Sequence, residues 1–415
     1  MRKANLPLLF ALLALAFAGP AFSQQRWERN YGGAGDERGF SVKQTSDTGY
    51  IVVGYSTSFG NGSLVYLIKT DASGDILWTK TFGGGASWDR GYSVQQTSDG
   101  GYIVAGYTGS YGNSYQVYLI KTNTLGDSLW IRNYGDTSKE YGYSVQQTSD
   151  GGYIVAGETG TYQDYQVYLI KTNAQGDTLW TRSYGRAYDD QGYSVQQTSD
   201  GGYIVAGTCD YSRYPHIYLI KTNASGDTLW TKTYGDTGYD YGYSVQQTSD
   251  SGYIVAGLTN SFGNYYQIYL IKTNATGDTL WTRTYGGSGS DWGYSVQQTS
   301  DGGYIITGTT TSFGNGYQVY LIKTDANGNS GVEDNSLGRT KPLTSNLSFS
   351  VVPNPFTSFA SVLGHEADRF TLYDISGRRV GTYRGDRIGA DVPPGVYFVR
   401  AEKGKGKPLQ IVKVR

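Results

Sequence analysis

Short apolar segments separated by glycine-rich turns fill residues 26–327. "YIVAGYT" at residues 102–108 and "QVYLIKT" at residues 116–122 are rich in β-branched and aromatic side chains. The turn "SDGG" precedes the first of these segments, and "NTLGD" follows the second. Such runs, bounded by Gly and Asp, predict β-strands joined by tight turns. No stretch of this region shows the apolar period of a helix.

This pattern of strands and turns is repeated six times. The segment "SVQQTSDGGYIVAG" begins at Ser93, Ser144 and Ser194, with near copies at Ser41, Ser244 and Ser295. Tryptophans recur at spacings of 51, 52, 50, 50 and 51 residues, at Trp27, Trp78, Trp130, Trp180, Trp230 and Trp281. Four antiparallel strands in about 50 residues, repeated along a chain, are typical of the blades of a β-propeller.

The sixth copy stops after three strands and continues into the polar segment "NGNSGVEDNS". The missing strand is predicted at the other end of the repeats, in "RWERNYGG" at Arg26–Gly33. A three-stranded blade would leave an unpaired edge and an uncovered apolar face. The predicted fold is therefore all-β, a six-bladed propeller of four-stranded blades closed by its N-terminal strand. A linear β-solenoid is the alternative architecture.

The composition of the chain changes at both ends of the repeats. Residues 1–23 carry Arg2 and Lys3, a short apolar run and "AFS", the pattern of a secretory signal peptide. Residues 24–327 form the predicted propeller, and the polar residues 328–345 predict a linker. Residues 346–415 contain short alternating segments that predict a small β-sandwich. No segment after residue 23 is apolar enough to cross a membrane, so the mature chain is expected to be exported without a transmembrane segment.

The turn and strand "NASGDTLW" at residues 223–230 resembles the Trp-docking motif of pyrroloquinoline-quinone-type propellers. This resemblance covers the third and fourth strands of a copy and implies a propeller fold. The family binds its quinone with a vicinal cysteine pair and a metal site. This chain has one cysteine, Cys209, and six predicted blades where the family typically has eight, so no quinone is expected. No cofactor is predicted, and calcium is the one that the sequence leaves open.

Four ordered motifs near the C-terminus resemble the sorting domain of the bacterial type IX secretion system. They are "PNPF" at residues 353–356, "LYDISGRRV" at 372–380, "VPPGVYFVR" at 392–400 and the terminal basic strand "QIVKVR". The resemblance implies secretion across the outer membrane to the cell surface or the extracellular space, with the type IX machinery as a partner. It also implies that the translocation signal includes Gly395, Tyr397, Lys413 and Val414.

Charge and catalytic side chains exclude several classes of function. The formal net charge is −1, which gives no attraction for nucleic acid. The two histidines, His216 and His365, fall in different predicted domains, and no catalytic triad or phosphate-binding loop is found. A glycosidase needs only two carboxylates. A carbohydrate-active hydrolase or lyase therefore stays open as an alternative.

Comparison of the six copies separates two sets of turns. The turns "TSDGG" and "NASGD" are nearly constant, whereas the loops between strands two and three, and between copies, vary widely. In a propeller these two sets lie on opposite faces. The variable loops are rich in Tyr, Trp, Asn and Gly, which predicts a binding surface for an extracellular glycan or protein. Candidate contact residues in this set are Trp88, Trp292 and Tyr239.

One acid is present in every copy, two positions before the Gly of the first strand. These residues are Glu37, Asp89, Glu140, Asp190, Asp240 and Asp291. A ring of six carboxylates at the channel mouth would bind a cation such as calcium or dock a basic ligand. The alternative is that each acid accepts hydrogen bonds from loop amides and braces neighbouring blades.

The sequence therefore predicts an exported propeller that binds a ligand through its variable face, without catalysis. The alternatives are a carbohydrate-active enzyme working at the channel mouth and a purely structural envelope protein.

Overall fold

The computed structural model describes residues 27–330, apart from 85–86, 113, 162, 186–187, 211–213, 264 and 314–315. Near the C-terminus it describes residues 351–352, 357–362, 368–401 and 409–413. The predicted signal peptide, most of the predicted linker, the "PNPF" motif and Val414 lie outside these residues. The chain divides into two compact units, residues 1–334 and residues 335–415.

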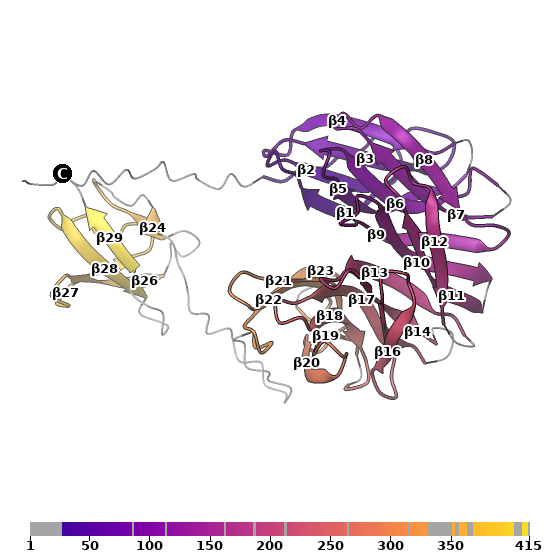
Figure 1. The fold of residues 1–415 in the computed structure, drawn as a ribbon. Helices are drawn as coiled ribbons and strands as arrows, with labels where there is room; N and C mark the ends of the chain where they lie inside the picture. Colours follow the sequence, from indigo (N-terminus) through magenta and orange to yellow (C-terminus); the bar gives the residue numbers. More distant parts are fainter. Residues whose placement is uncertain are drawn as a thin grey trace, which may run out of the picture. The chain divides into compact units, whose positions relative to one another are not determined.

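The first unit consists of six antiparallel sheets in chain order, and its described residues contain no helix (Figure 1). Sheet one contains β1 (Glu37–Gln44), β2 (Tyr50–Ser56), β3 (Leu64–Thr70) and β4 (Ile76–Phe82). Sheet two contains β5 (Asp89–Gln96), β6 (Tyr102–Thr108), β7 (Gln116–Thr122) and β8 (Ser128–Tyr134). Sheet three contains β9 (Lys139–Gln147), β10 (Tyr153–Thr161), β11 (Asp164–Thr172) and β12 (Thr178–Tyr184).

The last three sheets continue the same order. Sheet four contains β13 (Gln191–Gln197), β14 (Tyr203–Cys209), β15 (His216–Thr222) and β16 (Thr228–Tyr234). Sheet five contains β17 (Asp240–Gln247), β18 (Tyr253–Thr259), β19 (Gln267–Thr273) and β20 (Thr279–Tyr285). Sheet six has three strands, β21 (Asp291–Gln298), β22 (Tyr304–Thr310) and β23 (Gln318–Thr324). The repeated four-stranded meander is the architecture of propeller blades.

The turn between the first two strands has two glycines in sheets two, three, four and six, whereas Thr48 and Ser251 take the place of the first glycine in sheets one and five. In sheet two, Gly100 has a φ of +82°, a conformation that other residues rarely adopt. A Cβ atom on the next residue, Gly101, would lie 2.1 Å from the Thr122 carbonyl oxygen of the third strand. Only glycine at this position lets strands two and three remain in register beside the turn.

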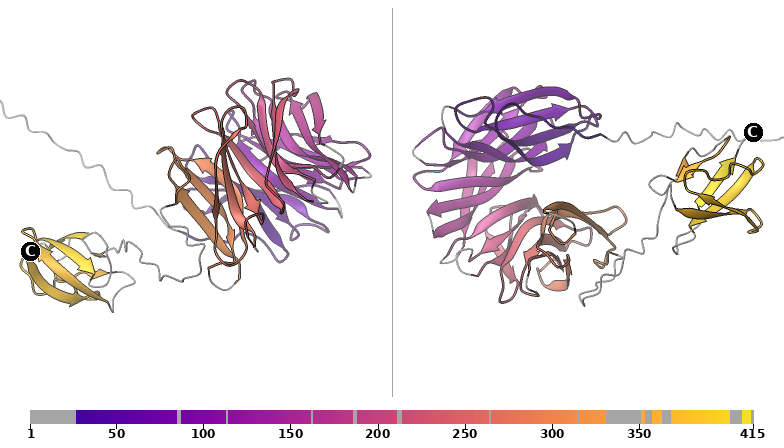
Figure 2. Two further views of the ribbon diagram at one scale, coloured as in Figure 1. Left: turned by 90° about the horizontal axis from the view of Figure 1, so that it is seen from below. Right: turned by 180° about the vertical axis from the view of Figure 1, so that it is seen from behind.

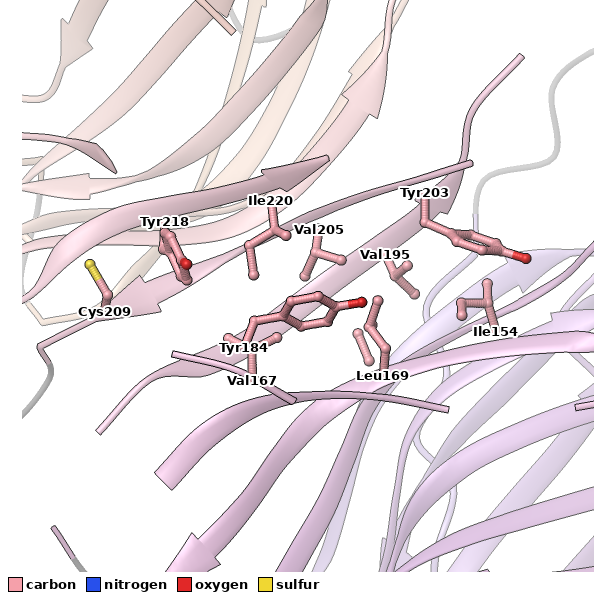
Figure 3. Close-up of a cluster of buried hydrophobic side chains, with 11 residues drawn as sticks. Ile154, Val167, Leu169, Tyr184, Val195, Tyr203, Val205, Cys209, Tyr218 and Ile220 are labelled. Carbon is pink, nitrogen blue, oxygen red and sulfur yellow. The ribbon is translucent and has the colours of Figure 1, made fainter. Parts of the chain in front are cut away.

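The apolar core lies between neighbouring sheets. Figure 3 shows one such cluster, in which Val167 and Leu169 of sheet three meet Val205 and Ile220 of sheet four. All four side chains are fully buried. Strands two and three are apolar on both sides, and sheets two to five each pack against two neighbours.

A tryptophan on each fourth strand fastens one sheet to the next. The Trp180 ring meets Tyr203 edge-on, with 5.8 Å between centroids, and it lies so close to Gly226 that a Cβ there would be 2.8 Å away. Four residues along the strand, the Tyr184 hydroxyl donates a hydrogen bond to the Gly226 carbonyl at 2.5 Å. The same Trp–Tyr contact links every sheet to its successor, through Trp78, Trp130, Trp180, Trp230 and Trp281.

A second contact between sheets runs along the first strands. Each first strand has a β-bulge, and the bulged residue is aromatic. Successive rings lie 4.9, 5.4, 5.4, 5.3 and 5.6 Å apart, in the order Phe40, Tyr92, Tyr143, Tyr193, Tyr243 and Tyr294. The bulge turns each ring out of the ladder and towards the neighbouring strand.

The constant turns are held by a buried lysine in sheets one to five. In sheet three, Lys171 Nζ lies 2.9 Å from Asp150 and donates a hydrogen bond to the Thr172 carbonyl at 2.8 Å. The lysine is 3% exposed, and it joins the "SDGG" turn to the end of the third strand. This contact gives the constant turns a structural role.

The predicted closing strand differs from the described structure. Residues 27–33 form no strand, and no fourth strand pairs with β23 among the described residues. Trp27 and Tyr31 instead make their side-chain contacts with sheet one. In Figure 2, sheet one (indigo) and sheet six (orange) lie at the two ends of the series of sheets. The closed ring therefore stays a prediction.

The second unit contains two small antiparallel sheets. β24 (Val351–Val352) pairs with β25 (Ser361–Val362). β26 (Arg369–Asp374), β27 (Arg379–Arg384), β28 (Gly395–Ala401) and β29 (Leu409–Lys413) form the other, in the order β27-β26-β28-β29. Its core includes Phe370, Leu372, Val399 and Ile411, all nearly or fully buried. The described part of the chain contains no helix that could cross a membrane.

Replacing Trp180 by alanine is expected to destabilise the first unit by about 3 kcal/mol, because the ring fills the contact between sheets three and four. Leu179→Ala is the matched control, since the neighbouring leucine is 57% exposed and is expected to cost under about 0.5 kcal/mol. Urea unfolding followed by tryptophan fluorescence and circular dichroism measures both. Equal effects of the two substitutions would contradict this role of the tryptophan.

Candidate variable-face site

The variable loops of all six sheets lie at one end of the strands. Each sheet is a meander, so the loops between strands two and three share an end with the connections to the next sheet. The constant turns lie at the other end. The sequence prediction that variation is confined to one face therefore follows from the observed strand order.

Exposed aromatic side chains gather in these variable loops. Ten aromatic residues there are between 39% and 67% exposed: Phe59, Trp88, Tyr111, Tyr188, Tyr214, Tyr239, Phe262, Tyr265, Phe313 and Tyr317. The large exposed aliphatic residues lie elsewhere. Examples are Leu129, Leu179 and Leu229, each 57% exposed, on the fourth strands. Aromatic surface is thus characteristic of one end of the sheets.

The three aromatic residues predicted as contacts have separate surroundings. Trp88 is 52% exposed, and the Arg90 guanidinium lies 5.2 Å from its ring. Tyr239 is 39% exposed and lies near Tyr214, with 6.4 Å between ring centroids. Trp292 stacks on Tyr317 at 5.3 Å. These residues belong to different sheets and do not form one cluster.

Asp89 shows how the repeated acids are held. Its carboxylate accepts hydrogen bonds from Ser110 Oγ at 2.7 Å, from Gly84 N at 3.2 Å and from the Thr108 hydroxyl. The side chain is fully buried, and a Cβ on Gly83 would lie 2.1 Å from Oδ2. The carboxylate therefore ties the loop between β6 and β7 to the connection that follows β4.

The other five acids are also turned inward. Three of them accept a serine hydroxyl at the same position: Glu37 from Ser58, Asp240 from Ser261 at 2.9 Å, and Asp291 from Ser312 at 2.7 Å. Glu140 accepts from the Thr159 hydroxyl at 3.2 Å, and Asp190 from the Asp210 amide at 3.0 Å. These hydrogen bonds are of the kind described by the second alternative, in which each acid accepts hydrogen bonds from the loops.

The environment moves the pKa values of these acids in both directions. Hydrogen bonds from Ser58 and Ser56 lower the pKa of Glu37. Burial raises the pKa of Asp240 and of Glu140, because the charged form loses contact with water. Within the described ranges, no three His, Cys, Asp or Glu side chains come together as ligands for a metal ion. A cation role for the ring stays a prediction.

Glu158 is a buried carboxyl group that the sequence analysis did not single out. It lies on β10, is 4% exposed, and accepts a hydrogen bond from the Tyr143 hydroxyl at 2.7 Å. Burial raises its pKa to about 7. Hydrogen bonds from Tyr143 and Gln191 oppose this rise, and the charge of Asp189 adds to it. The carboxyl group therefore changes charge near neutral pH.

A signal for Glu158 was present in the repeats. At the corresponding position of the second strand the other copies carry uncharged residues, which are Tyr55, Tyr107, Thr208, Leu258 and Thr309. An acid in one copy, where the other five copies carry uncharged residues, marks a local difference in an otherwise repeated core.

The residues of the predicted sorting signal lie inside the second unit. Gly395 pairs with Lys413 in the β28–β29 ladder. Lys413 is 9% exposed and donates hydrogen bonds to the carbonyls of Gly389 and Ala390 at 2.9 and 3.0 Å. The buried Tyr397 hydroxyl donates to the Pro393 carbonyl at 2.7 Å. These residues hold the loop before β28, and Val414 lies outside the described residues.

Comparisons of the chain with protein-family models and with curated protein sequences give no match. Among solved structures, PorZ of Porphyromonas gingivalis, an essential bacterial surface component of the type IX secretion system, is 11% identical with a TM-score of 0.43. That alignment covers 94% of this chain and 61% of the PorZ chain, so this chain spans about three fifths of PorZ. Sqt1 from Chaetomium thermophilum is 11% identical, with a TM-score of 0.43 and coverage of 91% and 96%. The Pan2 WD40 domain of Neurospora crassa is 9% identical, with a TM-score of 0.38 and coverage of 65% and 86%. Similarities this low assign neither a family nor a function.

Glu158→Gln is expected to stabilise the protein above neutral pH. The native carboxyl has a pKa of about 7, against 4.5 for an unperturbed glutamate. Between these values the native state keeps a proton that the unfolded state has lost, so stability falls as the pH rises, by at most about 3 kcal/mol. The amide does not titrate, and the stabilisation should vanish near about pH 4.

Thermal unfolding at about pH 5 and about pH 8 measures this difference. Glu28→Gln is the control, because this glutamate is exposed and its substitution should leave the pH profile unchanged. Parallel pH profiles for wild type and Glu158→Gln would show that the buried carboxyl does not titrate as expected.

Proposed function

We propose that this chain is an exported, non-enzymatic propeller that binds an extracellular glycan or protein through its variable face. Its C-terminal unit would act as a type IX sorting domain, and its partners would be the type IX machinery and the ligand. The four C-terminal motifs and the N-terminal leader pattern support secretion across the outer membrane to the cell surface or the extracellular space.

The observation that carries the binding proposal is the concentration of exposed aromatic side chains on one end of the sheets. Aromatic side chains supply a large contact area at low entropic cost, and they are enriched at binding surfaces. The scaffold below them is repeated almost without change, so these loops can vary without loss of packing. Buried strands fix the positions of the exposed rings.

The proposal includes closure of the ring by residues 26–33. The ring centroids of Trp27 and Tyr50 lie 5.6 Å apart. A Cβ atom on Gly74 would lie 2.6 Å from the Trp27 ring. The Tyr31 hydroxyl donates to the Gly74 carbonyl at 2.7 Å. The Trp–Tyr contact is made by all five fourth strands, and the tyrosine hydroxyl bond is made by β8, β12, β16 and β20. Side chains of residues 27–31 therefore make contacts with sheet one that are expected of the fourth strand of a preceding sheet, which supports the proposal.

The two ends of the series of sheets expose the surfaces that closure would cover. On β23, Val319 is 82% exposed, whereas Val117 at the same position of β7 is 1% exposed. On β1, Val42 is 58% exposed, whereas its counterpart Val94 is 1% exposed. Burying an apolar side chain of this size contributes about 2 kcal/mol. Joining sheet six to sheet one would therefore bury complementary apolar surfaces.

A carbohydrate-active enzyme at the channel mouth is less well supported. Glycoside hydrolysis needs two carboxyl groups that reach the substrate. Five of the six ring acids are at most 2% exposed and bonded inward, and the titrating Glu158 is 4% exposed. No specific observation favours this alternative over binding.

Closure predicts a disulfide between Cys substitutions at Arg29 and Leu321. Leu119 pairs with Arg132 in sheet two, and Leu321 and Arg29 occupy the same two positions of the repeat. Paired residues in an antiparallel ladder have Cα atoms about 5 Å apart, within the range of a disulfide. A Cys209→Thr background removes the native thiol, since Thr108 and Thr259 occupy this position in other copies.

Faster migration of the oxidised monomer on a non-reducing gel reports the disulfide. The control pairs Arg29→Cys with Ile322→Cys, where the two side chains would point to opposite faces of the sheet. No disulfide in the first pair, equal yield in both pairs, or a disulfide only between two chains would argue against closure.

The binding proposal predicts that the mature chain is retained by a glycan or protein ligand without turnover. Glycan arrays, polysaccharide substrates and extracts of surface proteins are the probes. The double variant Trp88→Ala/Tyr239→Ala should weaken retention at least about tenfold. Leu229→Ala/Leu280→Ala should leave it unchanged, because these exposed leucines lie on fourth strands.

Release of sugar products would favour the hydrolase or lyase. Retention by none of the probes would favour a structural envelope role. An unchanged affinity of the aromatic variant, together with a loss in the leucine variant, would move the binding surface away from the variable face.

A further inference from the structure

Four of the six loops between strands two and three share a Ser-aromatic-Gly motif. These are residues 58–60, 110–112, 261–263 and 312–314, in sheets one, two, five and six. The corresponding segments of sheets three and four read "ETGTYQDY" and "TCDYSRYPH" and lack it. The motif is therefore a repeated element within the otherwise variable loops.

The aromatic residue of each motif is half exposed and rests on the strand behind it. Phe59, Tyr111, Phe262 and Phe313 are 50%, 45%, 57% and 51% exposed. Their ring centroids lie 5.4, 6.1, 5.6 and 5.5 Å from a tyrosine of the third strand, which is Tyr66, Tyr118, Tyr269 and Tyr320 in turn. Each ring is supported on one side, and about half of its surface stays open to solvent.

The serine of each motif fixes the loop from below. Ser110 Oγ donates to the buried Asp89 carboxylate at 2.7 Å and accepts from the Gly84 amide at 3.1 Å. Ser312 Oγ donates to Asp291 at 2.7 Å and accepts from the Gly287 amide at 3.0 Å. These bonds hold the loop in place before any ligand arrives. A ring positioned in advance costs little entropy on binding.

Closure of the ring would make the four motifs neighbours. In the closed ring proposed above, sheets five, six, one and two follow one another, and sheets three and four complete the circle. The motif would then occupy four consecutive sheets with equivalent rings. Equivalent sites in succession suit a polymer built of repeating units.

We infer that these four loops form a multivalent binding site for a polysaccharide of neutral sugars. This inference rests on the proposed function and names its ligand class. The apolar face of a sugar ring stacks on an aromatic side chain, and the motif carries no charged residue that would select an acidic sugar. Binding of several sugar units of one polymer multiplies weak individual affinities, provided that the sites can be engaged together.

The test uses the mature full chain and immobilised mannan, xylan and dextran as probes. The quadruple variant Phe59→Ala/Tyr111→Ala/Phe262→Ala/Phe313→Ala should lose at least about a hundredfold in apparent affinity, and each single variant less than about tenfold. The matched control is Tyr214→Ala/Tyr265→Ala, which removes two exposed rings of the same face that lie outside the motif. A quadruple Leu variant keeps the apolar bulk without the aromatic ring, and it should fold as wild type and bind as weakly as the Ala variant.

The free monosaccharide provides the second measurement. The inference expects it to compete at least about a hundredfold less well than the polymer at equal sugar concentration. Equal competition, or a loss in the Tyr214/Tyr265 control as large as in the quadruple variant, would overturn the multivalent site while leaving binding by the variable face intact. Retention of proteins alone would overturn the ligand class. Failure of every glycan and protein probe would overturn the proposed function as well.

Discussion

The structure depends on the contact between one tryptophan and the sheet that follows it. The ring of Trp130 or Trp230 lies on a glycine turn and meets a buried tyrosine edge-on, so an L side chain in place of that glycine would clash with it. Because the tryptophan belongs to one repeat and the turn to the next, no repeat can bury its own apolar surface. Stability is then a sum over neighbouring pairs, as in other repeat proteins. The first and last sheets each lack one neighbour. The contact of Trp27 with Gly74 is therefore an important observation in support of the proposed closure of the ring.

The repeats are nearly identical in sequence, but the contacts at the interfaces between sheets differ. The Arg90 guanidinium lies over Tyr55 at 4.5 Å between sheets one and two. Tyr107 meets Tyr141 at 5.0 Å between sheets two and three, and Glu158 faces Gln191 between sheets three and four. A cation over a ring, two rings and a carboxyl–amide pair are not interchangeable. Separating Glu158 from Gln191 would leave a buried carboxyl group without one of its hydrogen-bond partners, at a cost of about 1–3 kcal/mol.

The repeat length, the strands and the separation of constant from variable turns follow from the sequence, because periodicity and glycine placement are local. "QVYLIKT" and "SLWIRNY" coincide with β7 and β8. The inward orientation of the repeated acidic side chains does not follow from the sequence. Asp89 is held by Ser110, a residue 21 positions away, and the local pattern does not connect the two. Lys413 likewise reaches carbonyls 23 and 24 residues earlier in the chain. The half-exposed rings were missed because the exposure of one residue type depends on tertiary neighbours. Glu158 differs from its five counterparts in the repeats, and that difference marks its position, whereas its burial depends on the neighbouring sheet.

The buried acids hold the loops that carry the exposed aromatic rings. An acid at the head of each first strand accepts a hydrogen bond from the loop between strands two and three, so the base of that loop is fixed whatever its tip contains. Sheets three and four lack the serine. There Glu140 accepts a hydrogen bond from the hydroxyl of Thr159, the counterpart of Thr108, and Asp190 accepts one from the Asp210 amide, while the sequences of the two loops differ from each other. A repeated acid therefore lets the tip of each loop change independently of the fold. The anchoring carboxylates are buried beneath the loops, and the four Ser-aromatic-Gly loops contain no charged residue. A ligand on these four loops would therefore be recognised by ring stacking rather than by ion pairing.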